Sequence, residues 1–316
     1  MKKIFFAFAI LILLFGCVGE NNNSIEPSRE DSIPANAVKM TPATDVYPPI
    51  LNSSEWSEPL PFGVPVNSAG AEDSPFITPD GKTFYFFFTP DPNIPAEKQL
   101  FDNVTGIWIS SKLANGSWSE PERVILQEKG KLSLDGCEFV SNDLMWFCSA
   151  REGYTGVNFF TAKRVNGKWQ DIQYVENKLM KDYELGEMHI SANGSELFFH
   201  SQRAGGKGGL DIWVSEKKDG EWQAPENIVA VNTADNEGWP YLSSNGKELW
   251  FTRYYLGSPA IFRSIRINGT FSEPELIVSQ FAGEPTLDDV GNLYFTHHFY
   301  NNSKMIEADI YIAYKK

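Results

Sequence analysis

A short aromatic motif recurs at nearly constant spacing along the chain, and this repetition limits the fold more than any other feature. The pattern Asn/Asp-Gly-x-aromatic occurs four times, with its aromatic at Trp118, Trp169, Trp222 and Phe271, at spacings of 51, 53 and 49 residues. Asn-Gly and Asp-Gly are the strongest short signals for a β-hairpin, because both central residues of its turn need positive φ. β-branched runs such as "IWISSKL" and "DIWVSEKK" precede the turns. Each unit is therefore predicted to end in a hairpin.

Each unit is also predicted to begin with a hairpin, made of a short strand, a polar turn and an aromatic-rich strand. The five segments with this scheme are 74–88, 137–149, 188–201, 240–252 and 285–297. No segment shows a convincing helical period. Two hairpins make four strands, and four-stranded units repeating about every 50 residues are typical of propeller blades. The sequence therefore predicts an all-β protein.

Each repeat unit consists of a first and a second hairpin, and the number of each indicates how the two ends of the repeat meet. Five first hairpins are present but only four complete second hairpins, and the chain ends in "ADIYIAYKK", a third strand with no fourth. The segment "SEWSEPL" at 54–60 stands alone before the first unit. Pairing it with the last strand closes a ring and removes two exposed sheet edges. We predict a five-bladed β-propeller with four-stranded blades, closed by this N-terminal strand. Six blades, or separate stacked sheets, are the alternatives.

Two stretches connect the repeat to a known family. "SPFITPDGKTFYF" (74–86) and "SQRAGGKGGLDIW" (201–213) closely resemble the WD-like, TolB-type β-propeller repeat of exported proteins. The resemblance covers about residues 54–316 and implies the propeller fold. Because such propellers mostly serve as binding platforms, it also implies a binding role, without specifying a ligand.

The N-terminus resembles the signal of an exported lipoprotein. Two lysines precede an unbroken apolar run over residues 4–15, which is too short to span a bilayer and has the length of a secretory signal. The run ends in "LFGC", and the resemblance implies cleavage before Cys17 and lipidation of this residue. An ordinary signal peptide or an uncleaved anchor is the alternative. The implied location is the outer face of the cell membrane or the cell envelope.

The segment after Cys17 has a different composition. Residues 18–50 are rich in Asn, Ser and Pro and contain few large apolar side chains. Such a segment buries too little surface to offset the entropy of ordering, so we predict a disordered tether. The predicted organisation is a signal peptide over 1–17, the tether over 18–50 and the propeller domain over 51–316.

The charge of the chain restricts its partners. A formal net charge of −14 argues against nucleic acid, and an anionic membrane would repel the body of the domain. The partners that remain are a protein or a glycan, together with a membrane reached through the lipid anchor.

Acidic residues recur at or near the start of the predicted first strands, which line the central channel of a propeller. The candidates for ligand binding are Glu72, Asp135, Glu187, Glu237 and Glu284, and Asp73 and Glu184 lie beside them. Carboxylates gathered around one opening raise one another's pKa or require a cation. Three interpretations remain open: carboxylates that accept hydrogen bonds from a neighbouring blade, a site for a cation such as calcium or for a basic partner, and an acid/base pair for cleaving sugars.

Other side chains add little chemistry. Trp239 and Tyr241 flank Pro240 in a predicted first strand and are candidates for stacking on a ligand. His189 and Glu187 are too few for a zinc site, so no metal site and no cofactor are assigned. The sequence has no Gly-x-Ser-x-Gly and no Cys-His signature, and therefore no catalytic nucleophile is predicted.

Cys137 and Cys148 are the candidates for a disulfide. A two-residue turn at Asn142-Asp143 pairs 141 with 144 and therefore 137 with 148, which brings the two Cα atoms to roughly 4.5–5.5 Å. Export permits oxidation, and two buried thiols are the alternative.

Taken together, these features predict a membrane-anchored, non-enzymatic binding module. A carbohydrate-active enzyme that uses the channel carboxylates and a scaffold subunit of a cell-envelope complex are the alternative functions.

Overall fold

The structure, a computed structural model, describes residues 28–128, 130–175 and 185–316. This part of the chain consists mainly of antiparallel strands, with two short helices, α1 (Arg29–Ser32) and α2 (Ala96–Gln99). No helix in the described ranges is long and apolar enough to cross a membrane. The prediction of an all-β protein is confirmed.

The strands form antiparallel groups of four, in chain order within each group except the last. The first group contains β3 (Ala71–Ile77), β4 (Thr83–Thr89), β5 (Gly106–Ser111) and β6 (Glu122–Arg123). The second contains β7 (Ser133–Ser141), β8 (Leu144–Arg151), β9 (Val157–Val165) and β10 (Lys168–Tyr174). The third contains β11 (Leu185–Ile190), β12 (Glu196–Ser201), β13 (Asp211–Lys218) and β15 (Glu226–Asn227).

The remaining groups complete the order. The fourth contains β16 (Glu237–Leu242), β17 (Glu248–Tyr255), β18 (Ser258–Ile267) and β20 (Glu275–Ser279). The last contains β21 (Ala282–Leu287), β22 (Leu293–Asn301), β23 (Lys304–Ala313) and β2 (Leu60–Pro61). The short strands β14 (Glu221–Trp222) and β19 (Thr270–Phe271) extend the hairpins of β13 and β18.

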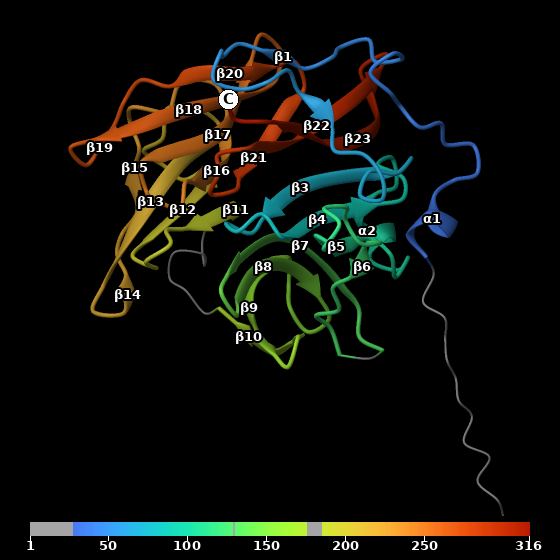
Figure 1. Ribbon diagram of the computed structural model, residues 1–316. Helices are drawn as coiled ribbons and strands as arrows, with labels where there is room; N and C mark the ends of the chain where they lie inside the picture. Colours follow the sequence, from blue (N-terminus) through green and yellow to red (C-terminus); the bar gives the residue numbers. More distant parts are fainter. Residues whose placement is uncertain (1–27, 129, 176–184) are drawn as a thin grey trace, which may run out of the picture.

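The groups are arranged in the manner of a propeller. Their first strands contact one another in the cyclic order β3, β7, β11, β16, β21 and β3 again, and they lie towards the middle of Figure 1 while β10, β14 and β19 lie at its periphery. A parallel pairing of Ala308 with Ala71 joins the last and first groups into one eight-stranded sheet. Aromatic second strands such as β4 are buried on both faces, because each sheet packs between two others.

The predicted turns are largely present. Both central residues have positive φ at Asn166-Gly167, Asp219-Gly220 and Asn268-Gly269. In the remaining turn, Asn115-Gly116, only Gly116 has positive φ. There the Leu113 carbonyl accepts the closing hydrogen bond from the Gly116 amide.

The segment 54–60 lies beside the last strand, as the number of first and second hairpins predicts. Leu60 and Pro61 pair with Ile312 and Tyr311, and Trp56 forms an isolated bridge with Lys315. The Trp56 ring is 1% exposed. Its indole N–H donates to the Gly291 carbonyl over 2.9 Å.

The prediction of a disordered tether is wrong for its described part, residues 28–50. Arg29 in α1 is 3% exposed, Lys39 forms ion pairs with β23, and β1 (Ile50–Leu51) pairs with β20. Composition misled the prediction because this segment buries charged side chains against carboxylates rather than apolar surface. Cys17 and residues 18–27 lie outside the described residues.

The structure joins Cys137 and Cys148 in a disulfide with a Cα–Cα distance of 5.4 Å. The predicted pairing of Ser141 with Leu144 is confirmed, but the direct pairing of Cys137 with Cys148 is wrong. Gly136, not Cys137, lies opposite Cys148. An additional residue in β7 forms a bulge after Gly136, and Cys137 has a φ of 54° there.

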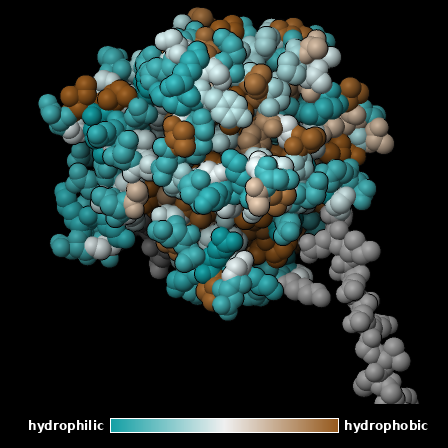
Figure 2. Space-filling model, viewed as in Figure 1, coloured by the Kyte–Doolittle hydropathy of each residue, from teal (hydrophilic) through white to brown (hydrophobic). Residues whose placement is uncertain are grey.

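The outer surface is consistent with the acidic composition. Figure 2 shows a largely hydrophilic face on which hydrophobic residues form small, separate groups. The most exposed apolar side chains, Leu256 at 89% and Val64 at 88%, lie far apart in the sequence. Isolated apolar residues of this kind are normal on soluble domains.

We expect Trp56→Ala to lower the melting temperature by roughly 10 °C. Removing a buried tryptophan costs about 3–5 kcal/mol, and each kcal/mol shifts a domain of this size by about 2–4 °C. The matched control is Trp222→Ala, since Trp222 is the half-buried tryptophan of a repeat hairpin and its removal should cost less. Equal shifts for both variants, measured by thermal unfolding, would contradict a special role for the 54–61 segment.

Candidate functional site

A β-bulge occurs at the same place in the first strand of every group. In each, two residues of the first strand oppose one residue of the second. The first bulge residue has a left-handed conformation at Ser74, Cys137, Trp239 and Glu284, with φ between 46° and 57°. A bulge redirects side chains and increases the local twist. In this protein the bulges turn three consecutive residues of each first strand towards a common axis.

These residues line one narrow cavity. Its wall consists of Ser74, Pro75, Phe76, Cys137, Glu138, Phe139, Glu187, Met188, His189, Trp239, Pro240, Tyr241, Glu284, Pro285 and Thr286. The space open to the centre of a water-sized sphere is about 40 Å³. We call this cavity the channel; it has room for a few water molecules or one small group.

Two of the predicted acidic residues, Glu187 and Glu284, do lie in the channel. Ser74 connects them, because its hydroxyl donates to Glu187 over 2.6 Å and its amide donates to Glu284 over 2.7 Å. Thr296 donates a second hydrogen bond to Glu284, and the Trp239 side chain donates one to Glu187. Both carboxylates are therefore held in place by neutral donors.

Glu138 accepts no hydrogen bond from another described residue. It is 7% exposed, and both of its carboxylate oxygens lack a hydrogen-bond partner within the described part of the chain. Burial raises the pKa of Glu138 to about 8; its own backbone amide lowers the pKa in part, and the nearby charge of Glu284 raises it further. Burial also raises the pKa of Asp73, and Glu284 and Glu187 raise it further. A buried carboxylate without a partner is costly, so Glu138 is the most unusual group of the channel.

The other three predicted acids lie outside the channel wall, which corrects the prediction. Glu72, Asp135 and Glu237 are each at most 1% exposed and lie two residues before the bulge. Because side chains alternate along a strand, these residues point away from the side on which Asp73 lies. They face the space between neighbouring sheets.

Each of these three carboxylates has a cation and hydroxyl donors beside it. Glu72 accepts from the amide and hydroxyl of Ser68 and lies 3.5 Å from Arg29, although burial still raises its pKa to about 7. Glu237 accepts from the amide and hydroxyl of Thr233 and forms an ion pair with Arg253 at 2.8 Å. Asp135 accepts from two serine hydroxyls and from Arg151 at 2.7 Å. This pattern matches the interpretation in which the carboxylates brace neighbouring parts of the fold.

Of the two aromatic residues predicted to stack on a ligand, only Trp239 has a partly exposed side chain in the channel. Trp239 lies in the channel and is half-buried. Tyr241 contributes to the wall, but it is 7% exposed and its hydroxyl donates to the Leu287 carbonyl, so it has no free face for stacking. His189 lies 4.6 Å from the Tyr241 ring, and burial lowers its pKa to about 3.

Among the described residues, no group of three or more His, Cys, Asp or Glu has a geometry that could hold a metal ion. The residues that could approach a cation are Asp73, Glu138, Glu187 and Glu284. Glu184, another predicted acid, lies outside the described residues.

Glu138 was missed in the sequence analysis, although a signal for it exists. Aligning the first strands on the bulge places Glu138 at the position of Glu187, within "CEF" and "GEM". A longer signal links "VNSAGAEDSPFI" (66–77) with "VNTADNEGWPYL" (231–242). This second pair would have marked Glu72 and Glu237 as equivalent residues with a shared structural role.

No protein-family model matches this chain, and no curated protein matches it. Among solved structures, it is similar to TolB from Acinetobacter baumannii, with 13% identity, coverage of 79% of this chain and 56% of that chain, and a TM-score of 0.44. The chain thus spans little more than half the length of that protein. A thermostable family-43 glycoside hydrolase has 10% identity, coverage of 79% and 91%, and a TM-score of 0.49.

A third similar structure is the catalytic domain of an α-L-arabinofuranosidase from Coprinopsis cinerea. It has 9% identity, coverage of 83% of this chain and 97% of that chain, and a TM-score of 0.49. Such low similarity transfers no activity to this chain.

We expect Glu138→Gln to remove a pH dependence of stability. The pKa of Glu138 is raised in the folded protein, so the folded state binds this proton more tightly than the unfolded state. The free energy of unfolding therefore falls as pH rises from about 4.5 to about 8. At pH 8.5, without added cations, the Gln variant should be more stable than wild type by about 2–4 kcal/mol; at pH 5 the two should be alike.

The control for this measurement is Glu221→Gln, which changes an exposed glutamate. Urea unfolding at both pH values gives the comparison. Parallel pH profiles for wild type and Glu138→Gln would show that Glu138 is not buried in the way described.

Proposed function

We propose that this chain is an exported, lipid-anchored binding module, built on a five-bladed propeller, that holds a cationic group in its channel. The observation that carries the proposal is Glu138, a buried carboxylate with both oxygens unpaired beside Glu187 and Glu284. Each carboxylate that ionises there without a counter-charge costs stability, and a ligand of opposite charge offsets this cost.

Two observations support five blades and a closed ring. The first strands contact one another in a cycle of five. The connection from β2 to β3 also repeats the connection from β15 to β16. Asn67 exchanges two hydrogen bonds with the backbone of Ile310, and Asn232 does the same with Ile212. The chain therefore passes from β2 into the first group in the same way as it passes from β15 into the fourth group.

The size of the channel favours a small cationic group over a sugar. Pockets that bind small organic molecules have volumes of roughly 300–1,000 Å³, whereas the channel offers about 40 Å³. A metal ion such as calcium and the ammonium or guanidinium group of a basic partner share the required charge. The channel is too narrow to admit a saccharide unit between two catalytic carboxylates, which disfavours the alternative of a carbohydrate-active enzyme.

Binding should depend on Glu138 and be independent of Glu237. At pH 8 we expect Glu138→Gln to weaken cation binding at least tenfold, measured by titration calorimetry. The matched control is Glu237→Gln, which removes the charged partner of the half-buried Arg253. It should lower the melting temperature by several degrees and leave the affinity within about threefold.

The titrants separate the two sources of the cation. Calcium and magnesium chloride test a metal ion, and lysine and arginine amides test the head group of a basic partner. Absence of binding by all of them, or equal binding by wild type and Glu138→Gln, would refute the cation site. Turnover of a polysaccharide that is lost in Glu138→Gln would instead support the enzyme.

The anchor is tested separately. We expect Cys17→Ser to leave the precursor uncleaved or to release the protein from the membrane, because the lipid is attached to that thiol. Membrane fractionation and the mass of the mature protein provide the measurement, with Cys148→Ser as a cysteine control. Normal processing and unchanged membrane partition of Cys17→Ser would contradict the lipoprotein proposal.

A further inference from the structure

The first and last strand groups lack charged partners that the second and fourth groups contain. In the fourth group, Arg253 lies directly opposite Glu237 in the β16–β17 pair. At the same place in the first group, Phe88 lies opposite Glu72, and in the last group Ala282 lies opposite His297. The first group therefore has an acid, Glu72, with no basic residue opposite it. The last group has a basic residue, His297, with no acid opposite it.

Residues from the segment 28–45 supply both missing charges. The Arg29 guanidinium lies 3.5 Å from Glu72, and its carbon lies 5.7 and 5.3 Å from the ring centroids of Phe86 and Phe88. Arg253 stacks on two aromatic rings of its own group in the same manner. Arg29 thus occupies, from outside the group, the role that Arg253 has within one.

Asp45 provides the acid for the last group. Its carboxylate lies 2.8 Å from Nε2 of His297, and the two side chains are 3% and 0% exposed. The His297 ring, which faces Ala282, therefore has a carboxylate partner, although its own first strand offers none.

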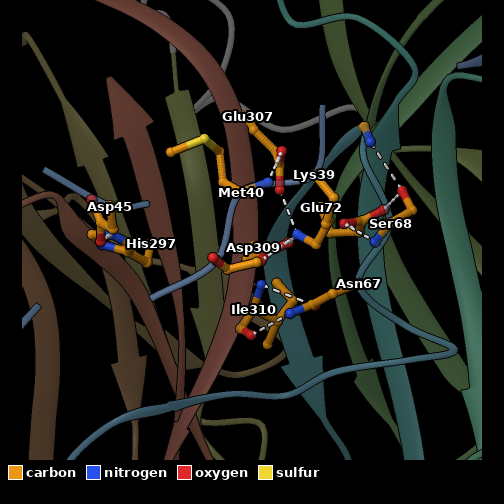
Figure 3. A network of polar contacts seen from close by, with 12 residues as sticks. Lys39, Met40, Asp45, Asn67, Ser68, Glu72, His297, Glu307, Asp309 and Ile310 are labelled. Carbon is orange, nitrogen blue, oxygen red and sulfur yellow. Dashed lines mark hydrogen bonds and ion pairs between the residues drawn. The ribbon is translucent and has the colours of Figure 1, made fainter. Parts of the chain in front are cut away.

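Lys39 lies between the two ends of the segment and neutralises β23. Its ammonium forms ion pairs with Glu307 and Asp309, which are both 2% exposed, and the adjacent Met40 amide donates to Glu307 over 2.8 Å. Figure 3 shows Lys39 beside Asp309 and Glu307, with Glu72 nearby and with Asp45 on His297. Burial raises the pKa of Asp309 to about 8, and Lys39 counters part of that rise.

These contacts lie where the two ends of the repeat meet. The last strand, β23, and the first strand of the first group, β3, are parallel neighbours there. Short parallel contacts contribute little hydrogen bonding, so the seam depends on side chains. The acidic side chains along it pair with two cations, and His297 pairs with a carboxylate.

We propose that this seam is a docking site for a segment bearing an arginine, a lysine and an aspartate, and that residues 28–45 of this chain are its resident occupant. The segment acts as a latch that holds the first and last groups together. This inference is independent of the channel ligand, because none of the latch contacts involves a residue that lines the channel.

The test cuts the latch after the protein has folded. A protease site is inserted after Tyr47, which is 44% exposed, into the full chain, and the purified protein is cleaved under native conditions. We expect the fragment that contains Arg29 and Lys39 to co-elute with the remainder in gel filtration at micromolar concentration. The fragment from Arg29→Ala/Lys39→Ala should separate.

A matched control keeps the test specific. Val38→Ala changes a residue of the same segment that is 78% exposed, and this fragment should co-elute like the wild type. A labelled wild-type peptide 28–47 should rebind the cleaved, washed protein at least tenfold more tightly than the doubly substituted peptide. If the double variant does not fold, the two synthetic peptides still make the comparison on cleaved wild-type protein.

Two results would overturn the proposal. One is separation of the wild-type fragment immediately after cleavage, with no rebinding of the peptide. The other is equal retention or equal rebinding of the wild-type and doubly substituted sequences, because the docking site would then not recognise the two cations.

Discussion

The inner strands of this protein bury carboxylates, and each of them needs a counter-charge or a set of hydrogen-bond donors. An ionised carboxylate in a low-dielectric interior is unfavourable by several kcal/mol unless it is paired. Asp135 and Glu237 meet this requirement with arginines of their own groups, and Glu72 meets it with an arginine from the N-terminal segment. The arginine that pairs with Glu72 therefore comes from the N-terminal segment, which lies where the first and last groups meet.

The same requirement separates structural from functional carboxylates. An acid two residues before the bulge lies between sheets, where serine, threonine and arginine side chains reach it. An acid at the bulge faces the channel, where the wall offers only a few neutral donors. Glu187 and Glu284 use these donors, and Glu138 is left without any within the described residues. For this reason the proposed ligand site is at Glu138 rather than at the more regularly spaced acids.

The arrangement also gives the N-terminal segment a structural role. Residues 28–51 run from α1 past β23 to the edge strand β20, and residues 54–61 then pair with β23. Along the chain, the ion pairs of Arg29 and Lys39 come first, and the backbone pairing of Leu60 and Pro61 with β23 follows. The two parts together cover the seam between the last and first groups, where β23 and β3 pair only at Ala308 and Ala71.

The repeat motif was sufficient to predict the all-β class, the hairpins and the pairing of 54–60 with the last strand, because turn chemistry and strand alternation are local properties. It was also sufficient to bring Cys137 near Cys148. It was not sufficient to identify the channel residues, because one additional residue in each first strand changes which side chains face the axis. The bulges, whose left-handed residues include Ser74 and Trp239, bring Glu138 and Glu187 together in the channel wall. The same bulges leave Glu72 and Glu237 outside that wall. The sequence by itself therefore determined the strands and their order. Only the tertiary structure decided which carboxylates meet in the channel and that Arg29, Lys39 and Asp45 complete distant groups, because burial and charge pairing depend on contacts between residues far apart in the chain.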